Sequence, residues 1–212
     1  MKFLTGFSRF LSVIFSPMLT ATYGVALAML LSYLCFSPLK ARLIVTAVTF
    51  AATCAIPVIA IYTLHKSGAV KEPGLNNRED RPVPYLIATA CYVGTAVYTR
   101  FVNAPMWLTM FLIGGALSLV VLTIVNTRWK ISGHATGMGG LTAIIFFLMF
   151  SGNSVIDLEP EFIAAIILSG MVCTARLILR RHTLGQVAAG FLNGFICIFA
   201  AAWWLAPLFS AN

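Results

Sequence analysis

The stretch that decides the fold is residues 104–126, APMWLTMFLIGGALSLVVLTIVN, which holds 23 residues without one charged side chain. An α-helix rises about 1.5 Å per residue, so about 20 apolar residues cross the hydrocarbon core of a bilayer. The stretch therefore predicts one membrane-spanning helix. Six further apolar segments are predicted to span in the same way: residues 17–36, 43–64, 84–101, 136–151, 161–179 and 185–208.

The composition of the whole chain agrees with this pattern. Of its 212 residues, 60% are hydrophobic and 9% are charged, whereas a soluble domain carries about 25% charged residues. Polar side chains cannot cover such a chain, so lipid must solvate most of its surface. We predict an all-α, polytopic transmembrane helix bundle of seven spans, forming a single domain over residues 1–212. The count is six if one of the two helices within 84–126 is re-entrant or lies in the interface.

The first 16 residues have a different character from the spans. Lys2 and Arg9 interrupt a face of Phe, Leu and Ile residues, a pattern typical of an amphipathic helix that lies in the membrane interface. A cleaved signal peptide is the competing interpretation, but Arg9 falls within the apolar core that such a peptide needs. We expect residues 1–16 to form an interfacial helix.

The net charge of +8 restricts the possible partners. Most Lys and Arg residues sit at the ends of the spans, where they set topology by the positive-inside rule or bind an anion. No long basic run or basic–aromatic stripe is present, so nucleic acid is not expected as a partner. The five cysteines are scattered through apolar segments without a CxxC motif, so neither a disulfide framework nor a thiolate metal site is expected.

Three polar connections carry most of the basic residues: residues 65–83, 126–134 and 176–186. Two predicted spans separate each of these connections from the next. All three are therefore expected on one side of the membrane, where they would converge at one face of the bundle. The acidic connection that holds Asp157, Glu159 and Glu161 is expected on the other side.

These three connections contain the residues suited to phosphate chemistry. Hydrolysis of a phosphate ester requires a nucleophile, donors for the equatorial oxygens and an acid for the leaving group. Imidazole can attack or transfer a proton, arginine forks grip phosphate oxygens, and a Ser-Gly turn at a helix start offers N–H groups. The candidates stand in this order: Gly74-x6-Arg81-Pro82, then Ile131-Ser132-Gly133-His134, then Ala175-Arg176-x5-His182-x3-Gln186.

This ordered set resembles the motifs of the type 2 phosphatidic acid phosphatase and vanadium haloperoxidase superfamily, which read KxxxxxxRP, PSGH and SRxxxxxHxxxD. The resemblance covers a small part of the chain, together with the alternation of motifs and spans. It implies that His182 is the nucleophile and His134 the general acid and base. It further implies that no metal or other cofactor takes part, and that phosphate is bound by Arg81, Arg176, Ser132 and Gly133.

The chain departs from the family pattern at four positions. Gly74 replaces the lysine of the first motif, and Lys71 or Arg78 of the same loop could supply the lost charge. Ile131 and Ala175 replace a proline and a serine. Gln186 replaces the aspartate that orients the nucleophile. Because His182 and Gln186 are four residues apart, they share one helix face, and the amide oxygen could accept from His182 Nδ1.

The sequence thus predicts an integral membrane hydrolase of a bacterial cytoplasmic membrane. Its expected substrate is a phosphomonoester or pyrophosphate of a lipid, with the tail between helices and the head group among the basic loops. A non-catalytic relative that binds or transports a lipid phosphate is the alternative, which Gln186 and the missing lysine favour. The charge rule places the basic loops in the cytoplasm, although relatives often act on the outer side.

Overall fold

The computed structural model describes residues 2–210, and every regular element in this range is helical. This confirms the all-α prediction. The α-helices are α1 (Lys2–Ile14), α2 (Pro17–Leu31), α3 (Leu39–Phe50), α4 (Ile56–Lys66), α5 (Pro82–Phe101), α6 (Met106–Asn126), α7 (Gly133–Phe150), α8 (Glu159–Ile178), α9 (Leu184–Ala200) and α10 (Ala206–Ser210). Three short elements join them: the 3-10 helix η1 (Tyr33–Phe36) and the π-helices η2 (Ala51–Ala55) and η3 (Ala201–Leu205).

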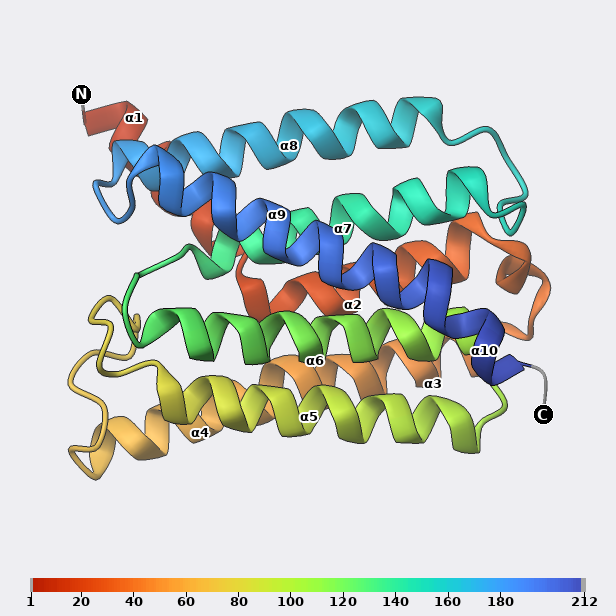
Figure 1. Cartoon of the computed structure of the whole chain (residues 1–212), viewed down its shortest axis with the longest axis horizontal. Helices are drawn as coiled ribbons and strands as arrows, with labels where there is room; N and C mark the ends of the chain where they lie inside the picture. Colours follow the sequence, from red (N-terminus) through yellow and green to blue (C-terminus); the bar gives the residue numbers. More distant parts are fainter. Residues whose placement is uncertain (1, 211–212) are drawn as a thin grey trace.

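Within the described residues, the structure gives five or six candidate membrane spans, against the predicted six or seven. Five helical segments of the described chain are long and apolar enough to cross a bilayer: Leu39–Lys66, α6, α7, α8 and Leu184–Phe209. The pair α1 and α2 is bent by 59° and makes a sixth if it forms one broken span. Predicted span 84–101 forms α5, which has 20 residues and runs beside α6 (Figure 1). Its prolines, tyrosines and Arg100 lower its apolarity below that of the other spans.

Two of the long helices contain a π-helical turn, and a proline accounts for each. Ile56 N–H donates to Ala51 O, five residues back, and Pro57 follows immediately. Ala206 N–H donates to Ala201 O in the same way, just before Pro207. Proline offers no N–H to the preceding turn, and a single π turn absorbs the resulting shift in hydrogen bonding. The segment Leu39–Lys66 is therefore continuous, as the predicted span 43–64 requires.

The core of the bundle forms around α7, which is packed by α2, α8 and α9. Glycines allow α7 and α9 to approach at backbone distance. A Cβ at Gly190 would lie 2.5 Å from Ser132 O, and a Cβ at Gly194 would overlap the carbonyl group of Thr136. Only residues without side chains can sit at such a crossing. The contact sets the start of α7 beside the start of α9, where two of the predicted motifs lie.

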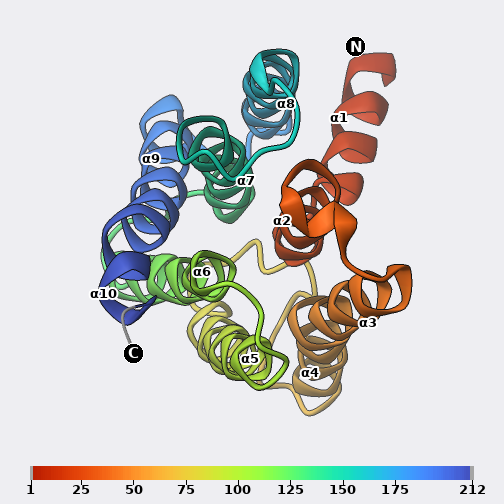
Figure 2. The same cartoon turned by 90° about the vertical axis from the view of Figure 1, so that its right-hand side faces the viewer.

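All three basic connections lie at one end of the bundle, as predicted (Figure 1). The α4–α5, α6–α7 and α8–α9 loops meet there, and α1 packs against α8 at the same end. Of the 14 Lys and Arg residues, only Lys40, Arg42 and Arg100 lie at the opposite end. The view along the bundle shows α1 leaning outward from the other helices (Figure 2). Of the predicted segment 1–16, Lys2–Ile14 forms the helix α1, Phe15 and Ser16 lie between α1 and α2, and Met1 falls outside the described residues.

Candidate active site

Arg81 joins the first basic loop to the second. It lies immediately before α5, whose first turn begins with Pro82, and its side chain is 6% exposed. Arg81 Nε donates to Leu75 O at 2.9 Å, and Nη1 donates to Ile131 O at 3.1 Å. These partners are neutral carbonyl groups, so they orient the guanidinium without neutralising its charge.

Arg176 occupies the last turn of α8 and is 9% exposed. Its Nη1 donates to Ser12 Oγ at 3.2 Å, while its buried Nε has no hydrogen-bond partner. Among the described residues, no carboxylate forms an ion pair with Arg81 or Arg176. Buried guanidinium groups normally pair with an anion, because removing a charge from water costs several kcal/mol. Here the guanidinium groups of Arg81 and Arg176 lie close together, and neither is paired with a carboxylate of the described residues.

His182 lies between α8 and α9 and is 8% exposed. Its Nδ1 is 3.3 Å from Gln186 Oε1, which also accepts from Thr183 N at 3.1 Å in the capping box of α9. Since this oxygen already accepts from a backbone N–H, it accepts from His182 as well. Nδ1 therefore carries the proton, and Nε2 keeps its lone pair. The predicted contact between His182 and Gln186 is present.

The environment of His182 holds its imidazole neutral. Burial lowers the pKa of His182 to about 4, and the positive charges of Arg81, Arg176 and Lys130 act in the same direction. The hydrogen bond with Gln186 opposes this shift. At neutral pH the ring is thus an uncharged imidazole with three cations nearby.

The Ser-Gly-His motif forms the start of α7. Ser132 is fully buried, caps the helix by accepting from Ala135 N at 3.4 Å, and donates its own N–H to Gln186 O at 3.1 Å. A Cβ at Gly133 would meet only the Tyr85 hydroxyl, at 3.5 Å. His134 Nε2 lies 3.0 Å from Ser12 O. Because a carbonyl oxygen only accepts hydrogen bonds, His134 donates from Nε2. Its other ring nitrogen, Nδ1, is not used in this bond.

The predicted residues Arg81, His134, Arg176 and His182 come together in the structure. Arg81, Arg176 and His182 are all close enough to His134 to interact with it electrostatically. They come from three separate loops or helix ends, which the hydrogen bonds of Arg81 and Ser132 hold in contact. The result is a cluster of two imidazoles and two guanidinium groups at one end of the bundle.

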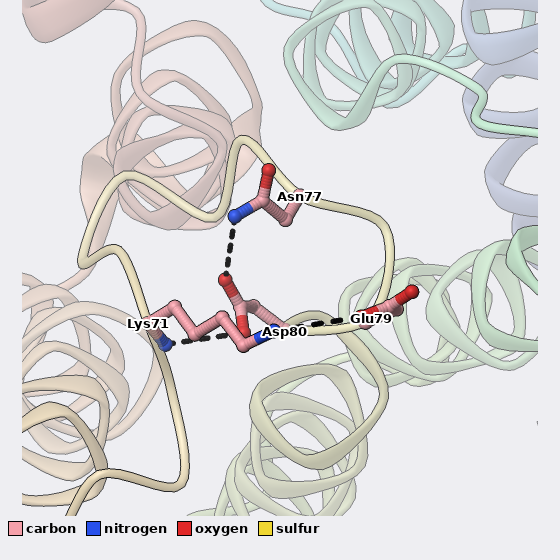
Figure 3. A network of polar contacts seen from close by, with 4 residues as sticks. All are labelled: Lys71, Asn77, Glu79 and Asp80. Carbon is pink, nitrogen blue, oxygen red and sulfur yellow. Dashed lines mark hydrogen bonds and ion pairs between the residues drawn. The ribbon is translucent and has the colours of Figure 1, made fainter.

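Lys71 and Arg78, which were expected to replace the missing lysine, lie elsewhere. The Lys71 side chain is 73% exposed and pairs with Glu79 at 3.9 Å (Figure 3). Arg78 Nη1 donates to Arg128 O at 3.0 Å, and Asn126 Nδ2 donates to Arg78 O at 2.8 Å. These contacts fasten the first loop to the second. Neither cation is a charged neighbour of His182.

The carboxylate of Asp80 serves the same loop rather than the cluster. Asn77 Nδ2 donates to Asp80 Oδ2 at 3.3 Å, and the Lys71 amide donates to Oδ1 at 3.1 Å (Figure 3). The Lys71 amide is the main reason that the pKa of Asp80 is lowered. Asp80 therefore stays ionised and fixes the loop that leads into Arg81.

Sequence reasoning gave too little weight to Lys130 and overlooked Ser12. Lys130 is half-buried, and burial together with Arg81, Arg181 and Arg176 lowers its pKa. It supplies a third cation near His182 from the second loop instead of the first. Its position two residues before Ser132 is the signal that could have identified it. Ser12 gave no such signal, because it lies 122 positions from His134 in the chain.

An apolar cavity of about 60 Å³ adjoins the cluster. It lies between α2, α5, α6 and α7, and Gly133 and Tyr85 line the part nearest to the motif residues. Farther along, Phe111, Leu119 and Ile198 line it. One end of the cavity therefore reaches Gly133, the residue before His134 in the chain, while its lining residues are uncharged.

The described residues contain no group of three or more His, Cys, Asp and Glu side chains placed to hold a metal ion. The five cysteines are free and half-buried. The polar groups at the site are the imidazoles and guanidinium groups of the cluster, with the ammonium group of Lys130 and the hydroxyl of Ser12 beside them. Comparison of the chain with protein-family models, with curated proteins and with solved structures finds no match.

Proposed function

We propose that this protein is an integral membrane phosphatase that hydrolyses a phosphomonoester or pyrophosphate of a lipid through a phosphohistidine on His182. One observation carries the proposal: buried Arg81 and Arg176 converge on a neutral His182 without a carboxylate between them. Two buried guanidinium groups so placed are stabilised by an anion. A phosphate group supplies that charge and several acceptor oxygens at once.

The electrostatics favour a dianion over a carboxylate ligand. Arg81, Arg176 and Lys130 each lower the pKa of His182, so all three act on the same small region. Arginine forks bind phosphate oxygens with two parallel hydrogen bonds, and lysine adds a mobile point charge. In phosphoryl transfer these groups stabilise the equatorial oxygens, where negative charge is spread in the transition state.

The two imidazoles support a two-step reaction. In the first step His134 is an imidazolium, protonated on both ring nitrogens beside the bound phosphate dianion. His182 Nε2 attacks phosphorus, the bond from phosphorus to the ester oxygen breaks, and His134 gives its Nδ1 proton to the departing oxygen. In the second step water attacks the phosphohistidine and gives a proton to His134, so that His182 and inorganic phosphate are released. With His134 Nε2 engaged by Ser12 O, the transferred proton is carried on Nδ1. Each step pairs one nucleophile with one proton carrier.

The surroundings of the cluster favour a lipid as the carrier of the phosphate. The charged groups lie at one end of membrane-spanning helices, and the apolar cavity begins at Gly133. A head group bound by the arginines would leave its tail beside α2, α5, α6 and α7. Most Lys and Arg residues lie at this end of the bundle, and the positive-inside rule favours a cytoplasmic position for it.

A non-catalytic protein that binds or transports a lipid phosphate is the second candidate function. Gln186, the side chain bonded to His182 Nδ1, is neutral and shares its oxygen with the Thr183 amide. A neutral partner orients the ring but does little to stabilise the positive charge that attack creates. Binding would persist without efficient turnover.

The deciding experiment measures phosphate release from a panel of lipid phosphates by purified protein in detergent. The panel includes phosphatidic acid, phosphatidylglycerophosphate and a polyprenyl diphosphate, and wild type is compared with His182→Ala. We expect wild type to release phosphate from at least one lipid and His182→Ala to release none. Binding of these lipids by wild type without release would instead establish the second candidate.

A further inference from the structure

Ser12 of α1 contacts two of the proposed active-site residues. Its hydroxyl accepts from Arg176 Nη1 at 3.2 Å, and its carbonyl accepts from His134 Nε2 at 3.0 Å. The same hydroxyl donates to Ser8 O at 2.9 Å, so its direction is fixed within α1. Ser12 thus forms hydrogen bonds with both His134, the proposed general acid, and Arg176, the proposed phosphate-binding arginine.

The amphipathic character of α1 explains why Ser12 faces inward. Ser8 and Leu11 are buried on the side that packs against α8. The opposite side exposes Phe3, Phe7, Phe10 and Val13. A helix with one apolar outer face lies stably against lipid. In this position the side of α1 that carries Ser8 and Ser12 faces the cluster.

We propose that Ser12 is a positioning residue of the phosphate site and that α1 forms one wall of it. This inference rests on the proposed function of the site. Ser12 Oγ holds one terminal nitrogen of Arg176, which directs the remaining N–H groups, including the unpaired Nε, toward the ligand. Ser12 O accepts from His134 Nε2, which leaves Nδ1 as the nitrogen that gives and takes the transferred proton.

The hydroxyl can be tested separately from the carbonyl group. Ser12→Ala removes the acceptor of Arg176 and leaves the main-chain contact with His134 in place. The loss should therefore appear in ligand affinity more than in the chemical step. Ser12→Thr keeps the hydroxyl and should restore affinity. Ser67→Ala is a matched control, because Ser67 is exposed at the end of α4 and its hydroxyl donates to Leu64 O of the same helix.

The experiment compares these variants by KM and kcat on the best lipid phosphate, and by calorimetric titration with inorganic phosphate. We expect Ser12→Ala to raise both KM and the phosphate Kd about tenfold, as for one hydrogen bond to a charged group, with kcat changed less than threefold. Equal constants for Ser12→Ala and Ser67→Ala, with thermal midpoints unchanged, would overturn the role of Ser12.

The titration also separates this inference from the proposed function. If wild type binds phosphate but hydrolyses no lipid, the proposed hydrolase is overturned, while the Kd values still decide whether Ser12 positions Arg176. If Ser12→Ala lowers kcat and leaves the phosphate Kd unchanged, the hydroxyl does not act through Arg176 and the inference is overturned alone.

Discussion

Arg81 Nη1 donates to Ile131 O at 3.1 Å, which joins residues 50 positions apart in the chain. The bond places the guanidinium of the first basic loop beside the Ser-Gly-His turn of the second. Through Ser132 N–H and Gln186 O, the second loop is in turn fastened to the start of α9. The site is therefore built by main-chain acceptors that bring three loops together, and its cations remain available to an anion.

Arg81→Lys should weaken substrate binding although the charge is kept. Arg81 reaches Leu75 O and Ile131 O from two different nitrogens, whereas lysine carries all its donors on one nitrogen and cannot form the planar fork that binds phosphate with two parallel bonds. We expect KM to rise at least about tenfold, or ~1.4 kcal/mol, and the thermal midpoint to fall. Steady-state kinetics would test this against Arg128→Lys, which alters an exposed side chain of the neighbouring loop. An unchanged KM would show that the guanidinium geometry of Arg81 does not contribute to substrate binding.

Gln186→Leu should lower phosphate release at least about tenfold, or ~1.4 kcal/mol, since it removes the acceptor that orients His182. Gln186→Asp should keep or raise the activity, because a carboxylate also stabilises the imidazolium. Gln186 caps α9 as well, so folding must be checked by size-exclusion chromatography. Wild-type activity in Gln186→Leu would rule out an orienting role.

His182 should titrate far below an ordinary histidine. Its folded pKa is about 4, whereas an unfolded chain has a value near 6.5. Between these values the unfolded state binds more protons, so stability falls as the pH is lowered through this range. NMR of labelled histidine, assigned with His182→Ala, would measure the pKa directly. Protonation of His182 near pH 6.5 in the free protein would contradict the buried, cation-rich site.

Gly194→Ala should destabilise the protein by about 1–3 kcal/mol, the usual cost of overpacking. The added Cβ would overlap the Thr136 carbonyl and push α7 from α9, which also separates Ser132 from Gln186. Gly170→Ala is the control, because a Cβ there meets nothing within 4 Å. Thermal unfolding followed by circular dichroism measures both variants, and equal midpoints would disprove the close crossing.

Phosphate release should continue in EDTA. The proposed site binds phosphate through guanidinium and ammonium groups, and the described residues hold no cluster of His, Cys, Asp and Glu suited to an ion. Hard cations need several oxygen ligands. The assay compares wild type with and without EDTA, followed by added magnesium. Loss of turnover that magnesium restores would refute the mechanism drawn from these residues.

The sequence alone determined the helical elements and the end of the bundle to which the motifs belong. The uncharged stretch 104–126 contains α6 (Met106–Asn126), because a helix satisfies every backbone hydrogen bond of such a stretch within lipid. The contact of His182 with Gln186 was predicted, but for the wrong reason: His182 lies before the N-cap of α9 instead of on its face, and Gln186 reaches it by turning back in the capping box. Both features are local in the chain, which is why composition and spacing could point to them.

Tertiary structure alone decided which further groups join the site. Lys71 and Arg78 belong to the motif loop, yet Lys71 pairs with Glu79 of the same loop and Arg78 bonds to the second loop, while Lys130 reaches the cluster. Ser12 contacts His134 and Arg176 only because α1 folds back on α8. Such contacts depend on the packing of distant helices and on competition between nearby hydrogen-bond partners. Neither the packing of distant helices nor the competition between partners can be predicted from residue spacing, so these contacts are seen only in the folded structure.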